Sequence, residues 1–408
     1  MELYTPPASP QPENQPPQNL QQARAVRLSE VRRRRQRKKR RMLALLGLLV
    51  VVAVAALAGV FRSSVTALAD LGDSIRIGLT PGGSYPVKTG IGQLYQVEKL
   101  AGGFVELGEK DVVLASASGL KLRTIQHGYA RPALAVGGNR FCVYNRAGYA
   151  LRVESRSQNL YTQTLDNAIL VCGMSQNGSL AVATRSNRYT AEVKVYSPNF
   201  VYRYGWNTTD NEGTPIRIAF APDNKRLAVA CLRADAGQMT TGIYLLDTRK
   251  DAVGADIQAE GSTLLQLSWV GSSQLLAVYD NYTALYDAAT GKERARFEYG
   301  DHLLDASISG KYVGLLLGTK GGATQLVTLG TNLNQLAQVS GSGAVGVTVT
   351  GTAVYQLDQS GVTCLTLKGV EKWRAELGVQ PQAVVSAKKL LVFTGSEAAL
   401  LTAPEQNG

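Results

Sequence analysis

The sequence predicts an all-β protein, a β-propeller that is preceded by one transmembrane α-helix and a disordered basic N-terminal tail. The propeller is indicated by a unit of short strands that recurs along most of the 408-residue chain, at a spacing typical of a four-stranded blade. Helical periodicity is negligible beyond residue 75, which argues against an α/β fold. The transmembrane helix is indicated by one long stretch without a charged side chain.

Most of the net charge lies in the first 41 residues. Residues 1–23 are rich in Pro and Gln and have almost nothing to bury, so we expect them to be disordered. Residues 24–41 form a basic juxtamembrane segment, and residues 1–41 together hold 11 Lys/Arg against three acids. The rest of the chain holds 32 bases and 28 acids. This near balance does not predict a nucleic-acid-binding surface.

Residues 42–61 form the predicted transmembrane helix, because they contain no charged residue and no Asn, Gln or Pro. Twenty helical residues span about 30 Å, the thickness of the hydrocarbon core of a bilayer. The excess of bases before this stretch predicts a cytoplasmic N-terminus and an extracytoplasmic C-terminal body, held at the cell membrane by a single span. The flank expected to contact anionic lipid comprises Arg32, Arg33, Arg34, Arg35, Arg37, Lys38, Lys39, Arg40 and Arg41.

A cleaved signal peptide is the alternative to this anchor, since "TALAD" offers a cleavage pattern near Ala69. An uncleaved anchor is favoured because the apolar stretch and the segment before it are both longer than those of a signal peptide.

A linker, residues 62–83, leads to the predicted propeller, residues 84–403, and residues 404–408 form a short tail. Complete units begin near residues 94, 131, 168, 214, 263, 302 and 344, and a truncated unit begins near residue 380. The last unit supplies three strands, and "YPVKTG" (85–90) is expected to supply the fourth and close the ring. This predicts eight blades, with seven as the alternative.

The repeats resemble those of known propeller families. "LYDAATGKERARFEYG" (285–300) is similar to quinoprotein-type repeats in its turn before the closing strand, and residues 214–248 resemble WD-type repeats. With its basic tail, membrane span and repeats, the chain from about residue 30 to 400 is similar to an uncharacterised family. Its members are single-pass, membrane-anchored propeller proteins of Gram-positive bacteria of the clostridial kind. The resemblance implies this fold and topology but no known activity, so it assigns no functional residue.

Residue patterns for common catalytic chemistry are not found. Quinoprotein enzymes resemble one another in a vicinal cysteine pair and in a tryptophan that ends each repeat, whereas the cysteines here are single and Ala295 stands at the tryptophan position of its repeat. No metal-spaced His, Cys, Asp or Glu set, P-loop or G-x-S-x-G occurs. "GSGAVG" (341–346) precedes a strand-like run rather than a helix, so it does not predict a pyrophosphate site. We therefore expect no catalytic residue, metal or cofactor.

Two residue types have more than one interpretation. The four cysteines lie in apolar runs and are expected to be buried thiols, with a disulfide between Cys142 and Cys172 left open. The two histidines, His127 and His302, are expected at blade junctions, where the ring bonds the backbone. Tyrosine is common (18 residues) and either serves a recognition surface or fills strand positions. The loops 127–132 and 207–215 are candidates for recognition.

These features predict a non-enzymatic function, a membrane-tethered binding or scaffold module for a protein or cell-envelope glycan partner. The alternative is a hydrolase or lyase that acts on envelope polysaccharide, which two or three carboxylates at one mouth of the central channel would favour. An apolar, Tyr-lined face without convergent acids would favour binding. A third hypothesis is signal transfer, in which the basic tail binds a cytoplasmic partner.

Overall fold

The computed structural model describes residues 64–404, except residues 81, 320 and 342. The predicted tail, basic flank and span all lie before residue 64 and therefore outside the described residues. Among the helices within the described ranges, none is long and apolar enough to cross a membrane.

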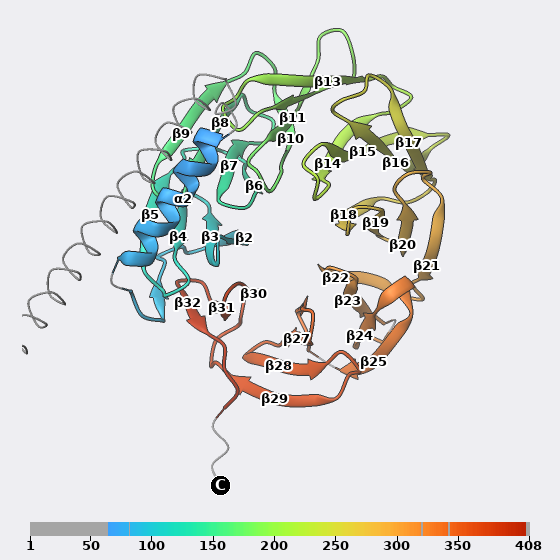
Figure 1. The fold of residues 1–408 in the computed structure, drawn as a ribbon. Helices are drawn as coiled ribbons and strands as arrows, with labels where there is room; N and C mark the ends of the chain where they lie inside the picture. The colour runs from blue at the N-terminus through green and yellow to red at the C-terminus, as the bar shows by residue number, and fades with distance from the viewer. Residues whose placement is uncertain (1–63, 81, 320, 342, 405–408) are drawn as a thin grey trace, which may run out of the picture. The chain divides into compact units, whose positions relative to one another are not determined.

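Residues 84–404 form eight four-stranded antiparallel sheets, which are arranged in a ring (Figure 1). The first four complete blades comprise β2 (Leu94–Leu100), β3 (Gly103–Gly108), β4 (Asp111–Ala115) and β5 (Lys121–Gln126); β6 (Pro132–Val136), β7 (Arg140–Asn145), β8 (Ala150–Ser155) and β9 (Asn159–Thr164); β10 (Ile169–Met174), β11 (Leu180–Arg185), β12 (Ala191–Tyr196) and β13 (Tyr202–Thr208); and β14 (Thr214–Phe220), β15 (Arg226–Asp235), β16 (Gln238–Asp247) and β17 (Val253–Ala259).

The next three blades continue the same order from the centre outward. They comprise β18 (Leu264–Val270), β19 (Gln274–Tyr279), β20 (Tyr282–Asp287) and β21 (Glu293–Glu298); β22 (His302–Ser309), β23 (Tyr312–Gly318), β24 (Thr324–Leu329) and β25 (Gln335–Gly341), with the short 3-10 helix η2 (Thr331–Leu333) before β25; and β26 (Gly346–Val349), β27 (Ala353–Leu357), β28 (Gly361–Thr366) and β29 (Glu371–Glu376).

The eighth blade closes the ring with strands from both ends of the propeller. Its inner strands are β30 (Ala383–Ser386), β31 (Leu390–Phe393) and β32 (Glu397–Leu400), and its outermost strand is β1 (Val87–Lys88). Val87 lies opposite Ala398 in an antiparallel register. The predicted eight blades and the closing role of residues 85–90 are therefore confirmed.

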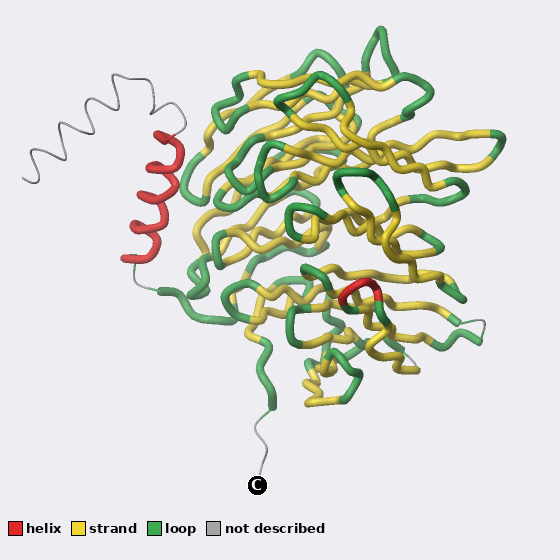
Figure 2. Tube along the Cα trace, turned by 45° about the vertical axis from the view of Figure 1, so that its right-hand side comes forward, coloured by secondary structure: helices red, strands yellow, loops and turns green. Residues whose placement is uncertain are grey.

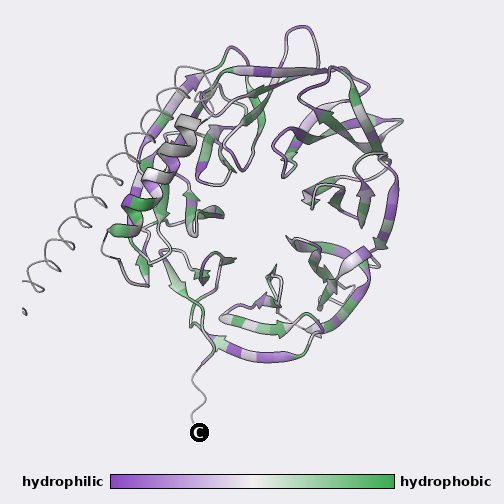
Figure 3. Ribbon diagram, viewed as in Figure 1, coloured by the Kyte–Doolittle hydropathy of each residue, from purple (hydrophilic) through white to green (hydrophobic). Residues whose placement is uncertain are grey.

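Burial differs with the position of a strand in its blade. Middle strands such as β7 and β19 are buried along almost their whole length, whereas the outermost strands β21 and β29 alternate exposed and half-buried residues. Figure 3 shows the same contrast in hydropathy, with hydrophilic residues frequent on the outer strands. A middle strand is covered on both faces by neighbouring blades, so its residues are apolar on both.

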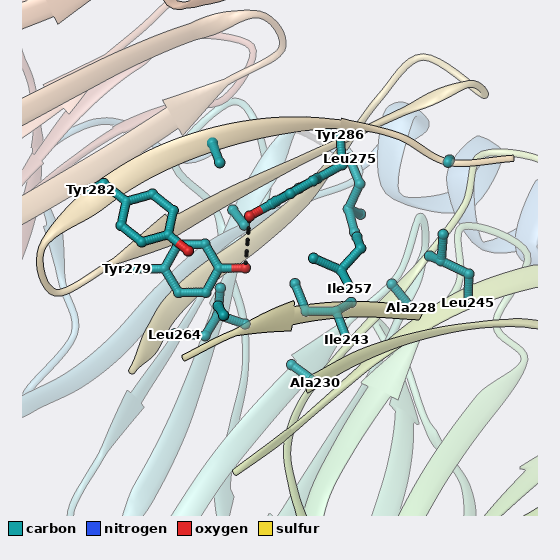
Figure 4. Packing of buried hydrophobic residues seen from close by; sticks show 14 residues of the cluster. Ala228, Ala230, Ile243, Leu245, Ile257, Leu264, Leu275, Tyr279, Tyr282 and Tyr286 are labelled. Atoms are coloured by element: carbon teal, nitrogen blue, oxygen red, sulfur yellow. Dashed lines mark hydrogen bonds between the residues drawn. The ribbon is translucent and has the colours of Figure 1, made fainter. Parts of the chain in front are cut away.

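The hydrophobic core lies between neighbouring blades. At the junction of the fourth and fifth blades, aliphatic residues of β15, β16 and β19 pack with three tyrosines (Figure 4). The hydroxyl groups of Tyr279 and Tyr286 are 3.3 Å apart and hydrogen-bond each other, and burial raises the pKa of both. The sequence allowed tyrosine to fill strand positions at blade edges, whereas these tyrosines lie on the middle strands β19 and β20, in the core.

The segment that the sequence presents as a linker contains a helix, α2 (Ser64–Leu79) (Figures 1 and 2). One face of α2 bonds the turns of the second blade. Asp70 forms an ion pair at 3.2 Å with the buried Arg140, and Asp73 accepts a hydrogen bond from Ser157 at 2.5 Å. Residues 70 and 73 lie on the same helix face. The expected linker is thus corrected to a helix that docks on the propeller.

Candidate functional site

A central channel of about 1200 Å³ lies between the blades of the propeller. The innermost strands of all eight blades line it, from β2 round to β30. Because every blade runs in the same order, all eight innermost strands begin at the same end of the channel. We call this end the N-terminal mouth.

Polar side chains on the innermost strands join neighbouring blades around the channel. The side chains of Gln96, Gln266 and Asp305 occupy equivalent positions in three blades, and each hydrogen-bonds the main chain of the next innermost strand. The bonded groups are Gln96 Oε1 with Leu134 N (3.2 Å), Gln266 Nε2 with Ala306 O (2.6 Å) and Asp305 Oδ2 with Val347 N (2.8 Å). These bonds stabilise the channel wall as a preformed surface.

Four exposed hydrophobic residues lie at the N-terminal mouth, on the first, fifth and sixth blades and at the start of the seventh. We call them the apolar rim: Tyr95, Leu265, Leu304 and Val345. Three of them are the extra residues of β-bulges, where the innermost strand has one residue more than its neighbour. A bulge redirects its side chain away from the regular sheet. Leu304, the extra residue of the bulge in β22, is 57% exposed beside the cavity.

Two arginines also line the channel near this mouth. Arg146 follows β7 in the turn to β8, and Arg217 lies in β14, where its Nε donates to Leu265 O at 3.1 Å. Burial lowers the pKa of Arg217, and the positive charge of Arg146 lowers it further. Arg146 also interacts with the Tyr144 hydroxyl. Within the described ranges, neither guanidinium group forms an ion pair with a carboxylate.

The acidic residues of the channel are separate from these arginines. Glu98 lies in the first blade and Asp305 in the sixth. Burial raises the pKa of each, and neither carboxylate shifts the pKa of the other. Both carboxylate oxygens of Asp305 accept backbone N–H groups. The side chains that the structure describes include no group of three or more His, Cys, Asp or Glu that could hold a metal ion.

The histidines are not brought together. His127 is buried, and both of its ring nitrogens bond the backbone: Nε2 lies 3.2 Å from Gly108 O, and Nδ1 accepts from Tyr129 N at 3.0 Å. His302 is exposed at the first position of β22. The nine basic residues of the predicted membrane flank lie outside the described residues.

Both candidate recognition loops lie on the face of the N-terminal mouth, because each connects an outermost strand to the next innermost strand. In the loop 207–215, the Glu212 carboxylate accepts the Thr209 N–H and hydroxyl, both at 2.7 Å. "GSGAVG" (341–346) connects β25 to β26, and a strand follows it.

All four cysteines are buried free thiols. Cys142 and Cys172 belong to adjacent blades and to one hydrophobic cluster. Burial raises the pKa of the Cys172 thiol, and contact with Cys142 raises it further. The disulfide that the sequence left open is therefore not formed in this structure.

Sequence reasoning missed the apolar rim and the two arginines. A signal was present, because the runs "LYQVE", "PIRIAF", "LLQLSW" and "LLDASI" each have a polar residue in third position within an apolar strand. That position holds the residues that contact the next blade, Arg217 among them. The bulges that expose the rim have no comparable signature, since they depend on pairing register.

Comparisons with known proteins show the fold and a family. Residues 84–399 match the family described as "Family of unknown function (DUF5711)". No curated protein matches the chain. Similar solved structures include the computationally designed Ika8 protein (10% identity, TM-score 0.57, 78% of this chain and 98% of that chain). They also include the C-terminal WD40 domain of Sif2 (11%, 0.56, 79% and 100%) and Saccharomyces cerevisiae Sqt1 (9%, 0.56, 78% and 97%). At these identities the likeness concerns the fold alone.

Proposed function

We propose that this chain, which belongs to the family of unknown function DUF5711, is a membrane-tethered, extracytoplasmic binding or scaffold module without enzymatic activity. Its partner is a protein or another component of the cell envelope. The family's other expected properties, a single membrane span and an origin in clostridial-type Gram-positive bacteria, are part of this proposal. The anchor is supported by the uncharged residues 42–61 and the basic flank before them.

The apolar rim is the observation that carries the proposal. Leu304, Leu265, Tyr95 and Val345 are exposed together at the mouth of a channel of about 1200 Å³. Clustered exposed apolar side chains, next to polar groups, are typical of interaction sites. The interblade hydrogen bonds hold the rim in place, so a partner would not have to order it on binding.

The attachment of α2 leaves this mouth accessible. Arg140, which bonds α2, is the first residue of β7, and Arg146 directly follows the last. A strand of this length spans about 20 Å, so α2 and the N-terminal mouth lie at opposite ends of the strand.

The channel gives a polysaccharide hydrolase no comparable support. Most glycoside hydrolases use two carboxylates that flank the scissile bond. The two described acids that line the channel, Glu98 and Asp305, belong to different blades, and Asp305 already accepts two backbone N–H groups.

Topology is tested with single introduced cysteines, because the four native thiols are buried. A cysteine in place of Asn211, on an exposed loop, is expected to react with a membrane-impermeant maleimide on intact cells. A cysteine in place of Ser9 is expected to react only after lysis. The reverse pattern would place the propeller in the cytoplasm and refute the proposed location.

Binding is tested by capture from cells that express the tagged full chain. Replacing Leu265 and Leu304 by serine is expected to abolish recovery of the crosslinked partner, because it removes apolar area at the centre of the contact. The matched control is Val370→Ser, which alters an equally exposed apolar residue in the turn after β28, on the opposite face. Equal loss with both variants, or with neither, would refute binding at the N-terminal mouth.

A further inference from the structure

Arg146 and Arg217 bring two positive charges from different blades into one channel. Both side chains line the cavity, and the charge of Arg146 acts on Arg217 across the third blade. No carboxylate within the described part of the chain forms an ion pair with either. Repulsion between them is relieved when an anion binds, and guanidinium groups are well suited to carboxylates because of their fixed fork of donors.

The main chain that carries the two arginines is fixed before any ligand binds. The Nε of Arg217 donates to Leu265 O at 3.1 Å, which ties it to the next blade. The main-chain N–H of Arg146 donates to Arg131 O at 2.8 Å, and the turn that follows bonds Ile169 at the start of the third blade. A ligand would therefore not have to order this main chain on binding.

We propose that Arg146 and Arg217 bind a carboxylate of an extended acidic segment from a protein partner, while apolar side chains of that segment cover the apolar rim. This inference rests on the proposed binding function of the N-terminal mouth and specifies its ligand.

A peptide fits this mouth better than a small anion or a glycan. Small-molecule sites occupy about 300–1,000 Å³, and the channel is larger, at about 1200 Å³. A free anion would leave the rim exposed to water. A polysaccharide offers few apolar groups to the aliphatic side chains of Leu265, Leu304 and Val345. An extended peptide with alternating acidic and apolar residues presents both kinds of group, because successive side chains of a strand point to opposite sides.

The test measures fluorescence anisotropy with the full chain in detergent micelles. One labelled nine-residue probe alternates leucine and glutamate, and the matched probe has glutamine in place of glutamate. The basic residues 24–41 also attract acidic peptides, so all measurements use about 150 mM salt and compare variants that share this segment. The variants are the double substitution Arg146→Gln and Arg217→Gln, the single Arg146→Gln, and the control Arg188→Gln. Arg188 is an exposed arginine of the β11–β12 turn that does not line the channel.

We expect the glutamate probe to bind the unmodified chain and the Arg188→Gln chain equally well. We expect the double substitution to weaken binding of the glutamate probe at least tenfold, since it removes two charged hydrogen-bond donors. We expect the glutamine probe to bind the unmodified chain no more tightly than the glutamate probe binds the double variant. Arg146→Gln alone is expected to give an intermediate loss. Among the described residues, Tyr144 is the hydrogen-bond partner that the Arg146 side chain loses, so this variant remains informative if the double variant does not fold.

Equal binding of the two probes, or no effect of the arginine substitutions, would overturn the inference. Arginine-dependent binding of polygalacturonate without binding of the glutamate probe would also overturn it, in favour of an acidic glycan. Competition by millimolar inorganic phosphate as strong as that by the peptide would assign the site to a free anion instead. Partner capture that depends on Leu304 but not on the arginines would overturn only this inference and leave the proposed binding function standing.

Discussion

Glu106 is predicted to make the stability of the propeller depend on pH. This carboxylate in β3 is fully buried, and its Oε2 atom has no hydrogen-bond partner among the residues that the structure describes. Its other oxygen lies 3.5 Å from the Thr89 hydroxyl, just after the ring-closing strand β1. Burial raises the pKa of Glu106 from 4.5 to about 7, although the Thr89 hydrogen bond and the charge of Lys121 act in the opposite direction.

The sign and size of the effect follow from the two pKa values. Between about pH 4.5 and 7, the folded chain retains a proton at Glu106 that the unfolded chain has lost. The free energy of unfolding therefore falls as the pH rises, by about 1.4 kcal/mol per pH unit, and the loss reaches about 3 kcal/mol above pH 7. Glu106→Gln keeps the shape of the side chain without the charge, so we expect it to stabilise the protein by about 2–3 kcal/mol at pH 8 and little at pH 4.5.

Urea unfolding at several pH values, followed by tryptophan fluorescence, measures this difference. The contributions of other titrating groups cancel when the variant is compared with the unmodified chain at each pH. The control is Glu192→Gln, which alters a partly exposed carboxylate paired with Lys194 and is expected to change stability by less than about 1 kcal/mol. Parallel stability curves for Glu106→Gln and the unmodified chain would refute the reasoning.

Three further predictions concern groups that hold the blades and α2 in place. Glu154→Ala removes a fully buried carboxylate bonded to two arginines and should lower the free energy of unfolding, measured in urea, by about 3 kcal/mol. The control Glu293→Ala, at an exposed ion pair, should lower it by less than about 1 kcal/mol. Equal losses from the two variants would contradict this prediction. Asp70→Ala should loosen α2 from Arg140 and speed tryptic cleavage after Arg76 about tenfold, and an unchanged rate would mean that the ion pair does not dock the helix. The four buried thiols should react with a thiol reagent only at the rate of unfolding, and fast labelling of the native chain would contradict their burial.

The blade architecture could be predicted because it repeats. Each blade repeats the same order of apolar strand and polar turn, so the period of the repeat indicated the number of blades. The incomplete last unit indicated an eighth blade that residues 85–90 close. The helix α2 was harder to recognise, because it occurs once and contains Gly72, a poor helix former. Its Asp70 and Asp73 lie one turn apart, but nothing in the sequence pointed to the arginine that Asp70 contacts.

The candidate site could be predicted only in part. The sequence showed polar residues such as Gln96 and Arg217 in apolar strands, but their partners lie on the next blade and depend on how the blades stack. The exposure of Leu304 depends on a bulge in β22, and a shift of one residue in strand pairing would turn the same side chain to another direction. Pairing register is a property of the folded chain and has no local sequence pattern here.

The binding role of the N-terminal mouth is tested most directly by a photoreactive amino acid placed at position 304 in the full chain in living cells. A second chain carries the same group at Val370, which is exposed on the opposite face. We predict that irradiation yields one discrete crosslinked protein from position 304 and none from position 370, and that Arg217→Gln reduces the yield at position 304. A product from position 370 alone, or the same products from both positions, would contradict the account.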